Sequence, residues 1–212
     1  MRFSKPFVAA IALTLIAGAS LAARVDLKDP RRALGREDNI RVDAQIAQET
    51  ISSRAPLNVT FQVENLTQAP IALADKVIDM SYDDDSRTIT LALGAEIPTG
   101  SAMPHLVVIA PGEKRVFSTG ALVHIMMPSG RTPWTAVPRF VQIKVNVLRD
   151  VTPFADLIEQ QRRSTTPPLM PGEMFDRWVE SSDAVYLNAI PVRWTATRTQ
   201  ITAENNEASG TY

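Results

Sequence analysis

The most regular feature of the sequence is the segment 57–65, in which apolar and polar residues alternate strictly as far as Glu64. The apolar members are Leu57, Val59, Phe61 and Val63. Successive side chains of a β-strand point to opposite faces, so these four residues would share one face and their polar neighbours the other. One buried face and one solvated face are typical of an antiparallel sheet that packs through a single side. The segment therefore predicts a central strand of such a sheet.

The same period of two recurs along most of the chain, with turn residues between the apolar runs. A second strongly alternating segment, 140–147, places four valine and isoleucine residues on one face. Together with shorter runs it predicts seven to nine strands, at 40–46, 57–65, 71–74, 77–82, 88–93, 105–110, 115–119, 121–126 and 140–147. Strands that follow each other with turns between them indicate a sandwich or barrel rather than βαβ units. A last edge strand with a bulge is predicted at 184–197, because the alternation changes phase near Ala189 and Ile190 and Pro191 lacks a backbone hydrogen-bond donor.

The segment 152–182 differs from the rest of the chain because its apolar residues follow a helical spacing. Thr152 and Pro153 predict a helix start, since threonine can cap the first turn and proline fits the first helical position. A second short helix is predicted at 172–180, where apolar residues gather on one side. The expected fold is therefore mainly β, an antiparallel β-sandwich with a short two-helix insertion before the last strand.

The N-terminal residues predict export. A short basic segment precedes sixteen uncharged residues, Phe7–Ala22, and small residues stand at the −3 and −1 positions of a cut after Ala22. This pattern is typical of a secretory signal peptide, whereas an uncleaved anchor needs about 20 apolar residues. We therefore expect a signal peptide at 1–22, a charged lead-in at 23–39, the β-sandwich domain at 40–197 and a disordered polar tail at 198–212.

Composition narrows both the location and the chemistry. Loss of the signal removes two basic residues and leaves 20 basic against 23 acidic residues, so no basic surface for nucleic acid is expected. No second apolar run approaches the length of a membrane span, so we expect no stable span after cleavage. The chain has no cysteine, which excludes thiol catalysis and thiolate metal sites. An exported chain without disulfides indicates the periplasm of a bacterium, or secretion from it.

Two short motifs are similar to those of a known class of domain. The long strand ends in Asn65-Leu66-Thr67, and the run Val107–Ala110 leads into a Pro111-Gly112-Glu113 turn. Over residues 40–148 these features resemble bacterial envelope domains of the immunoglobulin-like sandwich class. The resemblance implies an immunoglobulin-like β-sandwich that acts as a binding, spacer or assembly module. It implies no active site.

Methionine and histidine residues form the sharpest candidate for a metal site. The residues are Met103, His105, His124 and Met126. Thioether and imidazole groups suit Cu(I), and His124 and Met126 would project from the same face of a strand. The pattern is similar to periplasmic copper chaperones of the cupredoxin-like sandwich type, but their upstream histidine-rich segment is absent here, so His105 would have to replace it. The alternative is that the methionines fill gaps in the core and the histidines lie at strand ends.

An acidic run offers a weaker candidate. Asp79 and 83–85 could indicate calcium, but the run lacks the glycine and the distal glutamate of an EF-hand loop. A solvated hairpin tip is the simpler interpretation.

Apolar residues on or near the predicted helices are candidates for a partner surface. They are Phe154, Leu157, Met174, Phe175, Trp178 and Trp134. Exposed together, they would form an apolar patch for another envelope protein. The alternative is that the short helices cap an open end of the sandwich.

The absence of known catalytic motifs from the sequence limits the functions to be expected. The chain has two histidines and none of the nucleophile, zinc or phosphate-loop motifs of common enzymes. We therefore expect a non-catalytic binding or assembly module of the bacterial envelope that has no cofactor. A periplasmic copper carrier is the alternative.

Overall fold

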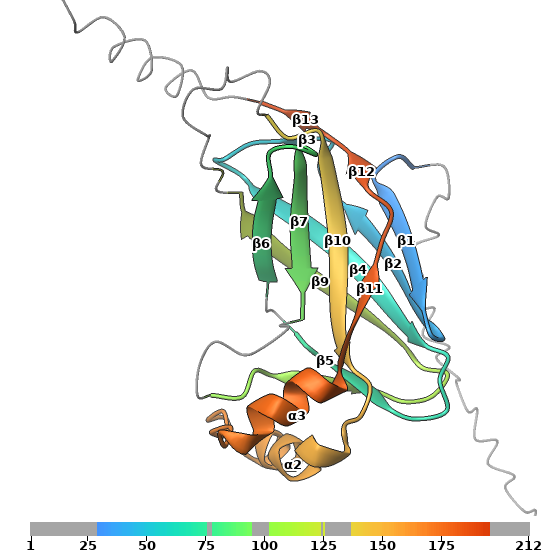
Figure 1. Cartoon of the computed structure of the whole chain (residues 1–212), viewed down its shortest axis with the longest axis vertical. Helices are drawn as coiled ribbons and strands as arrows, with labels where there is room; N and C mark the ends of the chain where they lie inside the picture. Colours follow the sequence, from blue (N-terminus) through green and yellow to red (C-terminus); the bar gives the residue numbers. More distant parts are fainter. Residues whose placement is uncertain (1–28, 76–77, 95–101, 124, 126–136, 196–212) are drawn as a thin grey trace, which may run out of the picture.

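The computed structural model describes residues 29–75, 78–94, 102–123, 125 and 137–195. Within these ranges the chain is mainly β, with two facing sheets and two helices at one end (Figure 1). The predicted signal peptide at 1–22 and the predicted tail at 198–212 lie outside the described residues. No helix in the described ranges is long and apolar enough to cross a membrane.

The first sheet has four antiparallel strands in the order β1-β2-β4-β9. Their bounds are β1 (Arg32–Glu37), β2 (Ile40–Ile46), β4 (Pro56–Asn65) and β9 (Lys114–Leu122). The strand with the clearest alternation, β4, pairs with β2 on one side and with β9 on the other, as its pattern predicted. β1 was not predicted, because its charged sequence resembles a lead-in. It forms a strand since all six residues pair with β2 and Ala33 is buried.

The second sheet has the order β6-β7-β10-β5-β8, with two further strands beside β10. The bounds are β5 (Ile71–Ala74), β6 (Ile78–Asp83), β7 (Thr88–Leu93), β8 (Leu106–Ile109), β10 (Phe140–Leu148), β11 (Ser182–Tyr186) and β12 (Ile190–Pro191). The pairs are antiparallel except β7 with β10, which is parallel. That exception arises because the chain crosses to the first sheet for β9 before it returns as β10. A second parallel pair joins β3 (Thr50–Ile51) to β13 (Arg193–Trp194).

The last part of the chain confirms the predicted bulge. β11 pairs Lys144 with Tyr186, whereas β12 pairs Val141 with Ile190, so the register shifts by one residue between them. The extra residue lies between Tyr186 and Ile190, beside the predicted phase change. The single edge strand predicted at 184–197 is instead divided into β11, β12 and β13, and β13 pairs with β3.

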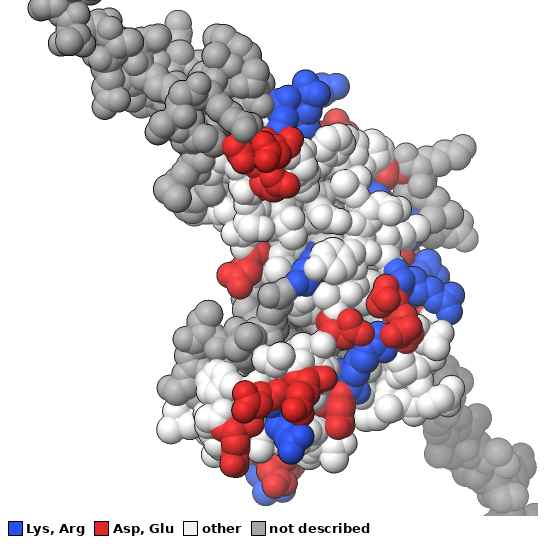
Figure 2. Space-filling view, viewed as in Figure 1, with Lys and Arg blue, Asp and Glu red and all other residues white. Residues whose placement is uncertain are grey.

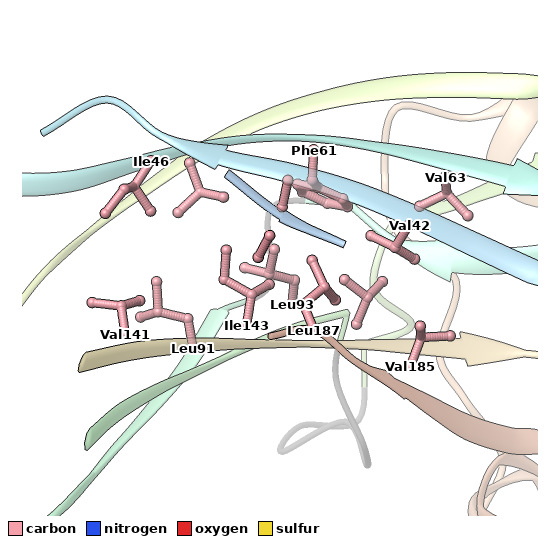
Figure 3. Packing of buried hydrophobic residues seen from close by; sticks show 14 of the residues in the cluster. Val42, Ile46, Phe61, Val63, Leu91, Leu93, Val141, Ile143, Val185 and Leu187 are labelled. Atoms are coloured by element: carbon pink, nitrogen blue, oxygen red, sulfur yellow. The ribbon is translucent and has the colours of Figure 1, made fainter. Parts of the chain in front are cut away.

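The main core lies between the two sheets (Figure 3). β4 contributes Val59 and Phe61, and β10 contributes Ile143 and Val145; all four are buried. The period of two in the sequence therefore predicted correctly which faces are hidden. The predicted strands 115–119 and 121–126 are one continuous strand, β9, as far as Leu122.

The two motifs of the resemblance meet in space. Asn65 is fully buried, and its side-chain amide donates hydrogen bonds to the carbonyls of Ala69 (2.8 Å) and Ile109 (2.9 Å). Gly112, whose φ of +75° lies in the left-handed region, donates its N–H to the Asn65 carbonyl (2.7 Å). The end of β4 and the Pro111-Gly112-Glu113 turn thus hold each other.

The two-helix insertion is present between β10 and β11. A 3-10 turn (Thr152–Phe154) leads into α2 (Ala155–Arg163), and α3 (Glu173–Ser181) follows. Thr152 does not cap the helix, which corrects the predicted start: it lies inside the 3-10 turn. The Asp150 carboxylate instead accepts a hydrogen bond from the Thr152 N–H (2.9 Å).

Candidate functional site

The residues predicted to form a partner surface divide into buried and partly exposed ones. Phe154 and Trp178 are fully buried and pack edge to face, with ring centroids 5.6 Å apart. They belong to a second core cluster under the helices, against which Leu157, Met174 and Phe175 are partly buried. Phe154 and Trp178 therefore hold the helices to the sheets, as in the capping alternative. Trp134 lies outside the described residues.

The outer surface of this helical cap is charged. Glu159 pairs with Arg163 at 2.8 Å, and Arg177 pairs with Glu180 at 2.9 Å. Figure 2 shows acidic and basic side chains close together over α2 and α3. These charged pairs lie on the same cap as two exposed apolar residues, Leu169 (71%) and Val179 (51%), so a partner surface on the cap stays a prediction.

The predicted copper ligands are only partly described. Met103 is buried in the second core cluster, where it fills space beneath the helices. His105 is on the surface, and its Nδ1 lies 2.9 Å from Oδ1 of Asp75. His124 and Met126 lie outside the described residues, so the copper site stays a prediction.

The acidic run forms the tip of the β6–β7 hairpin. The carboxylates of Asp83, Asp84 and Asp85 offer oxygen atoms within 4.8 Å of one another. Asp83 accepts hydrogen bonds from the Ser86 hydroxyl (2.7 Å) and the Asp85 N–H (3.0 Å), and these bonds lower its pKa. The turn itself accounts for this geometry.

One long side of the two-sheet structure is closed. There β1, an edge of the first sheet, lies against β11 of the second. A Cβ atom at Gly35 would come within 2.5 Å of the Tyr186 carbonyl oxygen, and Asn188 donates its N–H to the Leu34 carbonyl (3.2 Å). The close contact requires a glycine on β1 and joins the two sheets through their backbones.

The opposite edge of the first sheet is β9, which pairs only with β4 within the described ranges. Its nine residues all pair with β4, so β9 is a regular strand with one side of its backbone ladder free of any described strand. Outward-facing Val116 and Leu122 are 64% and 49% exposed. The inward-facing residues, Phe117, Thr119 and Ala121, are only partly buried.

Edge strands are usually protected by charge, short length or a covering segment. Among the described edges, β6 carries Asp79 and Asp83, and β8 has only four residues. β9 has Lys114 and Arg115 at its start, but the seven residues that follow, Val116–Leu122, carry no charge. β9 is therefore the long, uncharged and uncovered edge of the described structure.

A cavity of about 220 Å³ opens beside β9, between that strand and the ends of β5 and β7. Phe117 stacks on Phe61 along its wall, with ring centroids 5.1 Å apart and the planes at 21°. Leu93 and Ala74 also line the cavity, together with Asp75, whose carboxylate is engaged by His105. This mainly apolar wall suits the side chain of a segment lying along β9.

The sequence did not predict this site. It did contain a signal: a strand-length run without charge, directly after two basic residues. That run could not be identified as an edge without the order of strands. Comparison of the chain with protein-family models, with curated proteins and with solved structures found no match.

Proposed function

We propose that this protein is a non-catalytic binding or assembly module of the bacterial envelope that engages its partner by strand pairing at β9. Residues 1–22 would direct its export to the periplasm or beyond the cell. The observation that carries the proposal is the long, uncharged outer edge of β9, with Val116 and Leu122 exposed along it.

Strand pairing explains how such an edge can bind without a catalytic group. An added strand gains main-chain hydrogen bonds along the free ladder, and alternate side chains supply specificity. The cavity beside Phe117 would receive one inward-facing side chain of the added strand. Its apolar wall favours an aliphatic or aromatic side chain at that position.

The buried Asn65 and the turn that holds it support membership of the immunoglobulin-like sandwich class as part of this proposal. In such domains the core serves as a rigid frame and function resides in the edges and loops. Here β4 provides that frame, because it fixes β9 along its whole length.

A photo-crosslinking residue placed at Val116 in the exported chain tests the proposal. We expect adducts with exported proteins, other copies of this chain included, and far fewer adducts from the same residue at Ser81. Ser81 is the matched control because it is exposed on another edge strand, β6. Equal yields at the two positions would contradict strand pairing at β9, and retention of the chain in the cytoplasm would contradict the envelope location.

A further inference from the structure

We infer that the strand pairing with β9 belongs to a second copy of this chain, so that two β9 strands join antiparallel about a two-fold axis. This inference rests on the proposed function, because it uses the same edge. The product would be a dimer in which both four-stranded sheets form one continuous sheet of eight strands, since each contributes β1, β2, β4 and β9.

The faces of the strand limit the register. Even-numbered residues of β9 face outward and odd-numbered ones face the core, and directly opposed residues in an antiparallel pair share a face. An axis at Ser118, the middle residue of β9, satisfies this rule and pairs all nine residues. It sets Val116 opposite the partner copy's Gly120 and Lys114 opposite its Leu122.

Size favours this self-pairing on the outer face. Val116 is the most exposed apolar residue of the edge, and Gly120 offers no side chain against it. A Cβ atom at Gly120 would meet only the end of the exposed Asn58 side chain, with Oδ1 at 2.4 Å, which can turn away; the small size of the position is therefore a property of this glycine itself. Val116 of each copy therefore lies opposite Gly120 of the other copy, and this contact occurs twice, once on each side of the two-fold axis.

Charge favours the same arrangement. Antiparallel pairing places Lys114 and Arg115 at opposite ends of the joint strand pair, where each faces an uncharged residue, Leu122 or Ala121. Parallel pairing in register would set each basic residue against its own copy, which is destabilising. The two-fold arrangement is also closed, so it ends at two copies.

The partner copy would complete the cavity. On the inner face the axis sets Phe117 of one copy beside Thr119 of the other. Both positions line the cavity in each copy. The mouth of the cavity would therefore be walled by both chains.

The absence of cysteine from the chain allows a direct test by single-cysteine variants of the exported, purified protein. We expect Ser118→Cys to form a disulfide-linked dimer under mild oxidation, while Ser81→Cys on the other edge does not. Lys114→Cys and Leu122→Cys should each stay monomeric alone and crosslink when mixed, because they lie opposite each other only in this register. Equal crosslinking of Ser118→Cys and Ser81→Cys, or no crosslinking in the mixture, would overturn the inference.

A second measurement needs no crosslink. Leu122→Glu sets a carboxylate against Lys114 of the other copy and should tighten the dimer roughly threefold, whereas Leu122→Lys should weaken it by a similar factor. Analytical ultracentrifugation over a concentration series measures both. A wild-type chain that stays monomeric while the residue at Val116 crosslinks to other exported proteins refutes the second copy and leaves the proposed function standing. If the wild-type chain stays monomeric and the residue at Val116 also gives no more adducts than the residue at Ser81, both the second copy and strand pairing at β9 are refuted.

Discussion

The two long sides of this molecule enclose the same core, but the edge strand of the first sheet is covered on one side and uncovered by any described strand on the other. On one side β1 is held against β11 by a backbone contact at Gly35. On the other side β9 ends the first sheet with no described strand beyond it. An edge strand is a liability unless it is covered or used. The difference therefore points to a side that stabilises the fold and a side that is available for binding.

Ion pairs strengthen this contrast. On the closed side Arg149 pairs with Asp183 of β11 and with Asp38 in the turn after β1. The Asp29 carboxylate accepts hydrogen bonds from Arg31 and from Gln45 of β2 (2.8 Å), which fixes the start of β1. On the open side, among the described residues, Lys114 pairs with Glu64 and Arg115 with Glu113, and Val116–Leu122 has no ionisable group.

The largest expected difference in the free energy of unfolding is between substitutions of the two rings of one aromatic stack. Phe61 and Phe117 contact each other, but Phe61 is buried on β4 and Phe117 is partly exposed on β9. Phe61→Ala should lower the free energy of unfolding by about 3–5 kcal/mol, because it leaves a cavity in the core. Phe117→Ala should cost less, about 2 kcal/mol, because its ring is only partly buried. Urea denaturation measures both, and equal costs would mean that β9 is covered after all.

A smaller loss of stability is expected from a substitution on the closed side, where β1 contacts β11. Gly35→Ala places a methyl group 2.5 Å from the Tyr186 carbonyl oxygen, a backbone atom that cannot turn away. We expect a loss of about 2 kcal/mol, as for other overpacked positions. Gly172→Ala is the matched control: nothing lies within 4 Å of its Cβ, so stability should change by about 0.5 kcal/mol or less. Similar thermal unfolding of the two variants would show that β1 and β11 are not held by this contact.

The sequence predicted the core better than the edges, for a physical reason. Alternation at 57–65 and 140–147 records burial, so it identified β4, β10 and the faces that meet between the sheets. β1 was missed because its pairing with β2 depends on backbone hydrogen bonds, which leave no trace in its charged sequence. Backbone pairing also decides which strands lie at an edge.

The candidate site illustrates the same limit. The sequence predicts a partner surface that includes Phe154 and Trp178, because apolar residues at helical spacing do not show which side of the helix is covered. The structure buries them. The sequence alone predicts no role in binding for Val116 and Leu122, since apolar residues in an alternating strand are expected to be buried. Only the order β1-β2-β4-β9 shows that they line an edge.

Acid should weaken the closed side. Hydrogen bonds from the Arg31 side chain, with further help from the Arg31 N–H, lower the pKa of Asp29 from 3.8 to about 2. The folded state thus favours the charged carboxylate. Its contribution to stability is complete above the unfolded pKa and is lost as the pH falls from about 4 through about 2. In Asp29→Asn this part of the fall in thermal midpoint should be missing. An unchanged fall would show that Asp29 does not fix β1.

The smallest expected effect on stability lies at the open edge, and there it separates binding from folding. Val116→Lys changes a side chain that is 64% exposed, so the free energy of unfolding should stay within about 0.5 kcal/mol of wild type. The same change places a charge in the middle of the uncharged run, which is how natural edge strands resist pairing. Association measured by ultracentrifugation should therefore fall at least about tenfold, while the urea midpoint, measured at a concentration at which the chain is monomeric, does not move. Ser81→Lys adds the same charge to β6 and should leave association unchanged. If Val116→Lys instead unfolds the protein, β9 serves stability as β1 does, and the contrast between the two sides fails.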